Sequence, residues 1–574
     1  MTPHRLSERQ QHAVNSDDRA LLVVAGAGSG KTEVVAHRLE RLLNQSQSPD
    51  SRVLGLTYTL KASEELRERL ESRLGVLSKR VDTDTIHGFA LSLLRTYGTQ
   101  IGLPLDPEVV GNDDDRATVA AEMLGNLGRP SDLASARAFL VSVDLQRAEE
   151  IDSELVERWR DALAERAWLD FAAVLEAGTA LVESPFLRRI LPIRYSDVVI
   201  DEAQNLTKAQ FRFVRALLGV PPDQRISVCV VGDERQSIFH FAGARPELLA
   251  QFAEDYSATR IELNVDFRSS LAIRGFAERI DASVRSAPIG EFTVAPGHVE
   301  LHEAADEEAE AGFVVQWLEN CLANGLSAQW CLEIEDTQVT PEQCAVLARS
   351  GAALGRTAEK LRDKGIEHSV ASSADEWMAS NEGRLVLNLV AALGSPDHSA
   401  PQLQMQRSLR ECNGALGKQI LAADRNNGVA ALVDTLVSLN GSDEWLSDAE
   451  SLSRTWAEWR LTVQEGDVSF RAFANHLERV RRMEPNAKGV RLLTVHRAQG
   501  REFKAVLIVG CNKGQFPDFR AATPEEFAIE RKTFYVAVTR ASRALVLTRA
   551  KSRLTKFGSR STEPSEFLAI GGVR

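Results

Sequence analysis

The sequence predicts an α/β protein with two parallel-sheet cores, each interrupted by an inserted helical subdomain. Short apolar runs typical of buried parallel strands recur in two groups, before about residue 265 and after about residue 490. Between the groups the pattern turns helical, for example at 311–321, 357–364, 429–439 and 470–481. A glycine-rich turn follows the first apolar run, as in a strand–turn–helix unit. The expected strands are 21–25, 53–57, 198–200, 228–231, 492–495, 506–509 and 545–548.

The 574 residues are expected to form several compact units. Two long intervals between sequence motifs are too long for loops, so each is expected to hold an inserted subdomain. The expected division is a first core at 1–104, a helical insertion at 105–195, a return to the first core at 196–270, a second core at 271–390, a reduced helical insertion at 391–489, and the end of the second core at 490–574.

Composition excludes some classes of protein and leaves others open. Hydrophobic residues make up 44% and charged residues 26% of the chain, as in ordinary globular proteins. No apolar run approaches the roughly 20 residues that cross a bilayer, and the first residues lack the apolar segment of a signal peptide. We therefore expect a cytoplasmic protein. Six scattered cysteines without a C-x-x-C pair argue against a zinc site. The net charge of −13 argues only weakly against a nucleic-acid partner, because a local groove can differ from the mean.

The first motif, ALLVVAGAGSGKT at 20–32, predicts a phosphate-binding loop between a strand and a helix. The backbone N–H groups of such a loop and the helix N-terminus bind phosphate oxygens. Lys31 is expected to reach the β- and γ-phosphates, and the Thr32 hydroxyl is expected to hold Mg²⁺. The first position of the usual pattern is Ala25 instead of glycine. The loop residues are Ala25, Gly26, Ala27, Gly28, Ser29, Gly30, Lys31 and Thr32.

Two acidic residues, Asp201 and Glu202, follow the apolar run in VVIDEAQ at 198–204. In a phosphate-loop enzyme, Asp201 would hold Mg²⁺ and Glu202 would orient the attacking water. The alternative is that this pair only caps the next helix.

A third motif, VCVVGDERQSIFHFAGA at 228–244, places Gln236 after another strand. A glutamine there could bridge the γ-phosphate to a neighbouring surface. Phe239 and Phe241 alternate behind it, so in an extended segment both rings point the same way. They could stack on single-stranded bases, each stack contributing about 1–3 kcal/mol. The alternative is that both rings belong to the core.

Taken in order, these motifs resemble the UvrD/Rep/PcrA-type branch of superfamily 1 DNA helicases, and further matching segments extend over residues 6–541. On the nucleotide side, LSERQQHAV implies that Gln10 contacts adenine, with Phe267 beside it. LNVDFRSS implies that Arg268 contacts the γ-phosphate, and ERKTFYVAVTRA implies that Arg540 is an arginine finger. In LLTVHRAQGREF, Gly500 and Glu502 are expected near the nucleotide.

The same resemblance implies a set of residues that contact single-stranded DNA. LTYTLKASEELRERL, TIHGFA and LLTVHRAQGREF match the family's DNA-contacting motifs. The implied DNA-binding residues are Thr57, Tyr58, Thr59, His87, Phe239, Phe241, Thr494 and His496. Each histidine, taken alone, could equally be structural.

The resemblance implies two RecA-like cores that close on ATP and Mg²⁺ and thereby move single-stranded DNA, with 3′→5′ polarity. The expected DNA partner is a single strand or a duplex with a 3′ overhang. The chain departs from the family pattern at Glu33, Leu60, Phe267 and Ala242, and its second insertion is short. These departures motivate an alternative, a regulatory DNA-dependent ATPase subunit that unwinds little and partners a separate nuclease or repair protein, as in phage defence.

Overall fold

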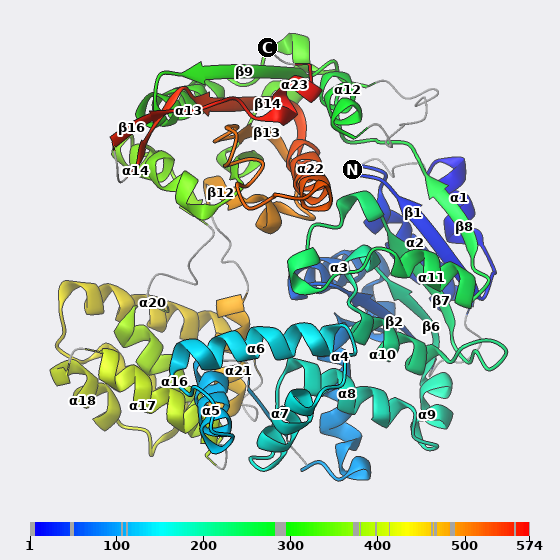
Figure 1. Ribbon diagram of the computed structural model, residues 1–574, viewed down its shortest axis with the longest axis vertical. Coiled ribbons are helices and arrows are strands. Elements are labelled where there is room, and N and C mark those ends of the chain that lie inside the picture. The colour runs from blue at the N-terminus through cyan, green and yellow to red at the C-terminus, as the bar shows by residue number, and fades with distance from the viewer. Residues whose placement is uncertain are drawn as a thin grey trace.

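In the computed structural model, the described residues are 6–45, 51–104, 107–110, 113–281, 294–370, 378, 380–396, 399–412, 414–460, 463, 468–482, 488–555 and 558–572. Two six-stranded sheets organise the chain (Figure 1). Every pair of neighbouring strands in both sheets is parallel. The predicted α/β class with two RecA-like parallel-sheet cores and helical insertions is therefore confirmed.

The first sheet has the strand order β3-β2-β6-β7-β1-β8. Its strands are β1 (Ala20–Ala25), β2 (Arg52–Thr57), β3 (Val81–Thr85), β6 (Tyr195–Ile200), β7 (Ser227–Gly232) and β8 (Thr259–Leu263). Alternate residues of β1 pack against opposite helical layers, because side chains of a strand point alternately to its two faces. Leu21 and Val23 belong to one hydrophobic cluster and Leu22 to the other.

Helices cover both faces of this sheet, which explains why its central strands are almost continuously apolar. One layer contains α1 (Glu8–Asn15), α2 (Lys31–Gln45) and α3 (Leu60–Leu74). The other layer contains α4 (Ile86–Tyr97), α8 (Phe171–Val182), α9 (Leu187–Arg194), α10 (Lys208–Leu218) and α11 (Leu248–Asp255).

The second sheet has the strand order β11-β12-β10-β13-β14-β9. Its strands are β9 (His298–Ala304), β10 (Cys344–Ala348), β11 (His368–Val370), β12 (Val490–Thr494), β13 (Phe503–Ile508) and β14 (Ala541–Ala550). On one face pack α12 (Leu271–Ile280), α22 (Pro524–Val538) and α23 (Glu566–Ile570), and on the other α13 (Glu307–Asn324) and α14 (Gly355–Asp363). A short hairpin, β15 (Ser552–Thr555) and β16 (Gly558–Ser561), follows β14.

The four segments expected to be helical between the strand groups overlap helices α13, α14, α19 (Gly428–Val437) and α21 (Phe470–Arg482), but the expected strands left out three that complete this core. Three strands, β9, β10 and β11, come from residues 298–370. Edge strand β9 is half exposed and alternates polar with apolar residues, while β11 has only three residues. Neither has the long apolar run that marks a buried strand in sequence.

Each core carries helices inserted between two of its strands. The first insertion contains α5 (Asp113–Asn126), α6 (Leu133–Ala148) and α7 (Glu154–Ala164), which share a hydrophobic cluster, and the short pair β4 (Glu108–Val109) and β5 (Trp168–Leu169). The second contains α16 (Asn381–Gly394), α17 (Ser399–Glu411), α18 (Gly414–Ala422), α19 (Gly428–Val437), α20 (Asp443–Arg460) and α21 (Phe470–Arg482). The domain boundaries expected from the sequence stay a prediction.

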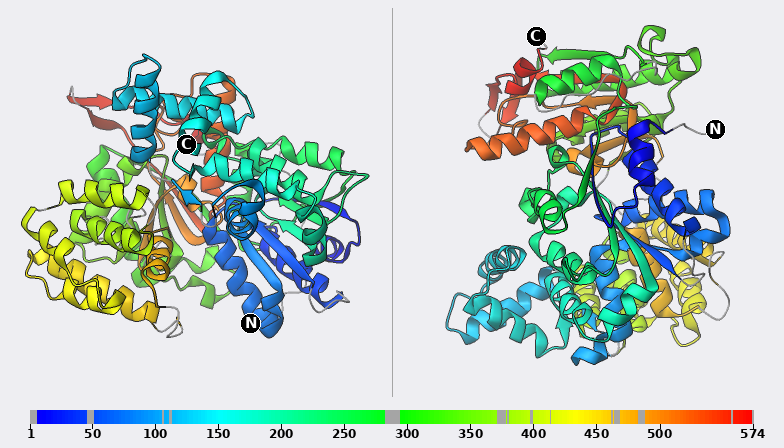
Figure 2. Two further views of the ribbon diagram at one scale, coloured as in Figure 1. Left: turned by 90° about the horizontal axis from the view of Figure 1, so that it is seen from below. Right: turned by 90° about the vertical axis from the view of Figure 1, so that its right-hand side faces the viewer.

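The two insertions touch through α5 and α17. The carboxylate of Asp115 is buried and lies 2.5 Å from Nη1 of Arg407, whose Nη2 donates to Thr118 Oγ1 at 2.7 Å. Gln404 Nε2 donates to the same carboxylate at 3.1 Å. The right-hand view of Figure 2 shows the second core at one end of the molecule and both sets of inserted helices at the other.

A buried ion cluster joins the first insertion to the first core. The guanidinium of Arg147 on α6 donates to both oxygens of Asp170 at 2.7 and 2.9 Å and to Glu176 of α8 at 2.9 and 3.0 Å. The indole of Trp159 donates to Asp170 at 3.0 Å. Burial opposes ionisation of Asp170, but Arg147 and these donors hold its pKa below the ordinary value.

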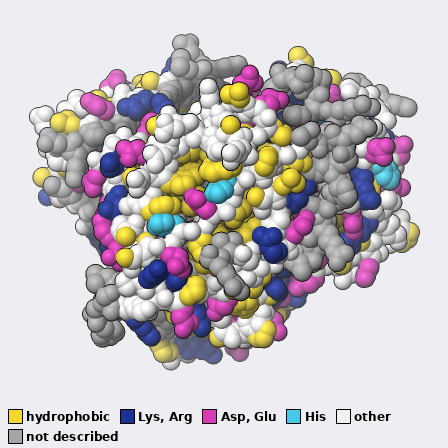
Figure 3. Space-filling model, turned by 90° about the horizontal axis from the view of Figure 1, so that it is seen from above, with side chains coloured by type: hydrophobic (Ala, Val, Ile, Leu, Met, Phe, Trp, Pro, Cys, Tyr) yellow, Lys and Arg dark blue, Asp and Glu magenta, His cyan; other side chains and the backbone are white. Residues whose placement is uncertain are grey.

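Acidic and basic side chains are mixed over the surface on the side of β9 and α12, with hydrophobic side chains gathered near the middle (Figure 3). Among the described residues, no helix has both the length and the apolar character needed to cross a membrane.

Candidate nucleotide and nucleic-acid site

The turn between β1 and α2 has the backbone of a phosphate loop. Gly28 and Gly30 have φ angles of 69° and 76°, which L side chains rarely adopt. A methyl group built on Gly28 would lie 1.9 Å from Oδ1 of Asp266, so the loop backbone packs closely against the segment that follows β8. Within the loop, Ser29 Oγ donates to the Gly26 carbonyl at 2.8 Å. Ala25 is buried at the end of β1, and Thr32 is half-buried in the first turn of α2.

The acidic pair lies beside the loop lysine. Asp201 and Glu202 follow β6, and Glu202 Oε1 is 3.2 Å from Lys31 Nζ. Glu202 has a φ of 53°, and a non-glycine residue in this region costs about 1–3 kcal/mol, a strain that clusters at functional sites. Burial and then the neighbouring Glu202 raise the pKa of Asp201 to about 6. Burial opposes ionisation of Glu202, but Lys31 keeps its pKa below the ordinary value.

Gln236 joins this cluster from the end of β7. Its Oε1 accepts from Lys31 Nζ at 3.4 Å, and its Nε2 donates to the buried Asp233 at 2.7 Å. Its backbone carbonyl accepts from Gln499 Nε2 of the second core at 3.2 Å. The structure therefore places Gln236 between the phosphate loop and the opposite core.

Two arginines and a glutamate complete the cluster. Arg268 follows β8, and its Nε lies 2.5 Å from Oε2 of Glu502 in the second core. Arg540 is buried after α22, where its Nε donates to the Val536 carbonyl at 3.1 Å and its Nη1 to the Arg501 carbonyl at 3.0 Å. Burial and then the nearby charge of Arg268 lower the pKa of Arg540 to about 10, so it remains a cation at neutral pH.

Lys31 and Arg540 face one site and not two separate ones. Two printed contacts join their surroundings across the cores. Gln236, which accepts from Lys31, also accepts from Gln499, and Arg268 pairs with Glu502, the neighbour of the residue whose carbonyl Arg540 contacts. Of the predicted catalytic residues, Lys31 contacts Glu202 and Gln236, and Asp201 directly precedes Glu202. Arg268 and Arg540 contact the adjacent residues Glu502 and Arg501 of the second core. Their catalytic roles stay a prediction.

The residues predicted to hold the nucleotide base differ in burial and in hydrogen bonding. Gln10 lies over the loop, but its amide already donates to the Ser29 carbonyl at 2.9 Å and accepts from the Ser7 N–H at 2.8 Å. Phe267 is exposed, and its N–H donates to the Gly28 carbonyl at 2.9 Å. Gly500 has a φ of 79°. Contact of these residues with adenine stays a prediction.

Glu33, which departs from the family pattern, is part of an ion cluster with α3. Arg73 Nη1 lies 2.8 Å and Arg69 Nη1 3.6 Å from its carboxylate, and His37 lies 3.0 Å from it. Glu33 is therefore held by ion pairs with two arginines of another helix, which sequence spacing did not reveal.

The residues present fit a nucleoside triphosphate with Mg²⁺. Two loop glycines in left-handed backbone, Lys31 and Arg268 provide donors for phosphate oxygens, and Arg540 adds a buried positive charge. Asp201 is a buried carboxylate at a strand end, and oxygen ligands are those that Mg²⁺ prefers.

An aromatic cluster spans both cores at the predicted DNA contacts. The ring of Phe239 lies 5.3 Å from Tyr58, 5.9 Å from Phe241 and 5.8 Å from His496. Phe241 is 69% exposed and meets His496 edge-on at 5.3 Å. Phe241 is therefore a surface ring, whereas Phe239 packs partly against the core of the second sheet.

The other predicted DNA contacts are less open. Thr57 is buried, and its hydroxyl donates to the Thr59 carbonyl at 2.9 Å. Thr59 caps α3 by accepting from Ala62 N–H. His87 is half-buried against Phe171. Thr494 is half-buried and begins the turn η11 (Val495–Ala498), which carries His496.

Both histidines are neutral bases at physiological pH. Burial lowers the pKa of His87 to about 4. Burial and then the charge of Arg349 lower the pKa of His496 to about 4. Arg349 itself pairs with Glu530 of α22 at 2.8 Å. Sequence reasoning missed Arg349 and Gln499, whose partners Glu530 and Gln236 are distant in sequence, and Arg235, which pairs with Asp233 two residues before it.

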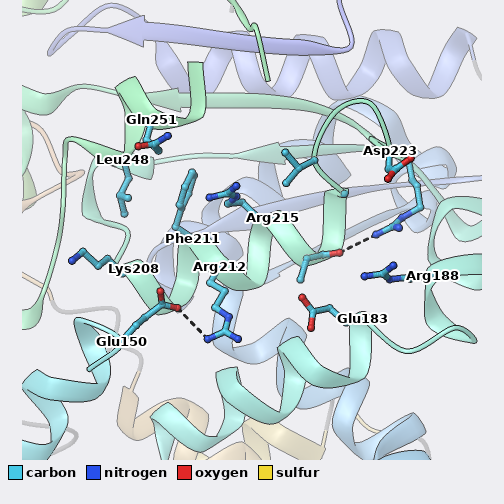
Figure 4. Close-up of a pocket in the computed structure, with 14 residues that line it drawn as sticks. Glu150, Glu183, Arg188, Lys208, Phe211, Arg212, Arg215, Asp223, Leu248 and Gln251 are labelled. Atoms are coloured by element: carbon cyan, nitrogen blue, oxygen red, sulfur yellow. Dashed lines mark hydrogen bonds and ion pairs between the residues drawn. The ribbon is translucent and has the colours of Figure 1, made fainter. Parts of the chain in front are cut away.

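A separate groove of about 710 Å³ lies along α10 (Figure 4). Arg212 pairs with Glu150 at 3.6 Å, and Arg215 pairs with Asp255 at 3.3 Å. The groove residues are Glu150, Glu183, Arg188, Lys208, Phe211, Arg212, Arg215, Ala216, Gly219, Val220, Asp223, Arg225, Leu248 and Gln251. None is a predicted site residue, so this groove is distinct from the nucleotide site.

Comparison with known proteins agrees with this geometry. Residues 6–257 match the UvrD/REP helicase N-terminal domain, and residues 404–552 match the UvrD-like helicase C-terminal domain. A protein of Staphylococcus aureus named ATP-dependent DNA helicase PcrA is 25% identical, with 98% of this chain and 86% of the relative covered. The protein of that name in Staphylococcus epidermidis is 24% identical over the same shares.

Proposed function

The chain belongs to the UvrD/REP helicase family, and from this premise we propose that it is an ATP-dependent helicase that moves 3′→5′ along single-stranded DNA. The main support is the contact between the two cores at this site: Gln236, which accepts from Lys31, also accepts from Gln499, and Arg268 pairs with Glu502 of the second core. ATP can drive opening and closing of the two cores only if the hydrolysis site is built from residues of both.

The proposed chemistry divides the work among these residues. The loop amides and Lys31 bind the phosphates, and Glu202 orients and polarises the attacking water. Arg268 and Arg540 stabilise the negative charge that develops on the transferred phosphoryl group. Thr32 and Asp201 would hold Mg²⁺, which when bound neutralises phosphate charge.

We expect DNA to move because the open and closed arrangements of the cores make different contacts with ATP and with DNA. A triphosphate binds the closed arrangement of the cores better than the open one, because only closure brings the second-core cation to it. The aromatic cluster contains Tyr58 and Phe241 from one core and His496 from the other, so closure changes how the two halves hold the bases. The polarity of movement rests on family membership alone.

A second candidate is a regulatory DNA-dependent ATPase that unwinds little and acts with a separate nuclease or repair protein. The exposed Ala242 beside Phe241 favours it, because an alanine at this position offers no positive charge to DNA phosphate.

A strand-displacement assay separates the two candidates. Duplexes with a 3′ or a 5′ overhang are offered with ATP and Mg²⁺, and ATP hydrolysis is measured with and without oligothymidine. The motor predicts displacement of the 3′-overhang substrate only, and DNA-stimulated hydrolysis that falls as salt rises. Hydrolysis without displacement, together with a nucleotide-dependent change in partner binding, supports the regulatory candidate.

A further inference from the structure

We infer that Arg235 is a positioning residue for ATP hydrolysis, an inference that rests on the proposed function. Arg235 lies in the turn η4 (Glu234–Gln236), which directly follows β7 and Asp233. It stands next to Gln236 in sequence and reaches the phosphate loop in space.

Asp233 orients Arg235 and Gln236 at the same time. Its Oδ1 accepts from the backbone N–H of Arg235 at 3.2 Å and from Nε at 2.7 Å. Its Oδ2 accepts from Gln236 Nε2 at 2.7 Å. Asp233 is buried, so a carboxylate oxygen left without a hydrogen bond would destabilise the fold. The ion pair with Arg235 therefore fixes which oxygen of Asp233 faces Gln236.

The far end of the same guanidinium lies over the phosphate loop. A methyl group built on Gly26 would lie 3.2 Å from Nη2 of Arg235, so this nitrogen occupies the space that a side chain at 26 would need. One planar group therefore extends from Asp233 to the loop backbone. The side chain is 26% exposed, which is too buried for a freely moving surface arginine.

The second core closes the other side of this arrangement. Turn η4 packs against α22, and Gln499 donates to the carbonyl of Gln236. Arg235 thus holds the turn that carries Gln236 in place against both the loop and the second core. The consequence is a Gln236 side chain fixed within hydrogen-bonding distance of Lys31.

A lysine cannot reproduce this contact. Arginine presents donors in a rigid fork that can serve two partners, whereas a single ammonium is a point charge on a flexible stem. Arg235→Lys keeps the charge but loses the span from Asp233 to Gly26, so we expect it to behave like Arg235→Ala.

The test measures steady-state ATP hydrolysis in the full-length protein with saturating oligothymidine. Because displacement of a reacting group by about 1 Å can cost about 100-fold, we expect Arg235→Ala to lower kcat by about 10- to 100-fold, with KM changed less than about 3-fold. Arg235→Ala combined with Gln236→Ala should be no slower than Gln236→Ala alone, since Arg235 acts through Gln236.

Arg520→Ala is a matched control. Arg520 makes the same pair of hydrogen bonds to the carboxylate two residues before it, at 3.0 Å from N–H and 2.8 Å from Nε, but it is 73% exposed. Its kcat should equal that of the unchanged protein. Thermal unfolding of every variant checks that the fold is kept.

Three outcomes would overturn the inference: an unchanged kcat in Arg235→Ala, full recovery in Arg235→Lys, or multiplicative losses in the double variant. Failure of the proposed function has a different signature, because the unchanged protein would then show no DNA-stimulated hydrolysis at all.

Discussion

Phe241 should account for a large share of the affinity for single-stranded DNA. Its ring is 69% exposed and is supported by Phe239 and His496. Stacking on an aromatic ring contributes about 1–3 kcal/mol per base, and 1.4 kcal/mol is tenfold in affinity. Phe241→Ala is therefore expected to weaken binding by about 5- to 150-fold.

The same substitution should leave the fold intact. The buried third of the ring is about 60 Å², which at about 25 cal/mol per Å² stabilises the fold by about 1.5 kcal/mol. The measurement is fluorescence anisotropy with labelled oligothymidine at fixed salt, together with ATP hydrolysis in the absence of DNA, which should not change.

Phe519→Ala controls for general loss of an exposed ring. Phe519 is 78% exposed and lies 5.7 Å from the guanidinium of its neighbour Arg520, outside the aromatic cluster. Its loss should leave DNA affinity unchanged. Equal affinities for Phe241→Ala and the unchanged protein, or an equal loss in Phe519→Ala, would refute the assignment of Phe241 as a stacking surface.

Three further predictions concern catalysis, pH and stability. Lys31→Ala should abolish ATP hydrolysis, and Arg540→Ala should lower kcat by about 10³–10⁵-fold while ATP binding, measured by titration, changes little; normal turnover in either variant contradicts the catalytic roles of these two side chains. Because the pKa values of His87 and His496 are about 4, both are neutral above about pH 5, so DNA affinity at constant ionic strength should show no step between about pH 5.5 and 8; an inflection near 6.5 removed by His496→Gln would be inconsistent with this. Arg147→Ala removes the buried cation that Asp170 and Glu176 share, leaving Arg116 at 3.6 Å from Asp170 and Arg160 at 3.1 Å from Glu176, and should lower the local stability of α6 and α8 by about 3 kcal/mol, measured by hydrogen exchange; unchanged protection there would show that the cluster is not stabilising.

Sequence reasoning found the elements whose signal is local. The phosphate loop was predicted because the strand, the turn glycines and Lys31 are contiguous, and the structure confirms the strand–turn–helix unit around Gly28 and Gly30. Strands such as β9 were missed because a half-exposed edge strand has no continuous apolar run.

The missed site residues depend on contacts between distant segments. Arg235 follows an aspartate by two positions, a weak signal, and only the folded chain shows that its guanidinium reaches Gly26. The bond from Gln499 to Gln236 joins the two cores, and no spacing rule predicts it. The two arginines that pair with Glu33 come from α3, so no local pattern around position 33 predicts these ion pairs.

The contact between α5 and α17 joins the two halves of the chain at a second place, separate from the contacts around Gln236 and Glu502. Because each insertion is rooted in a different core, any swing of one core against the other is transmitted to the pairing of Asp115 with Arg407. A wide opening of the cores would either expose the buried carboxylate of Asp115 to solvent or require one insertion to rotate relative to its own core. The contact between α5 and α17 therefore limits how far the two cores can separate while the ion pair between Asp115 and Arg407 stays formed.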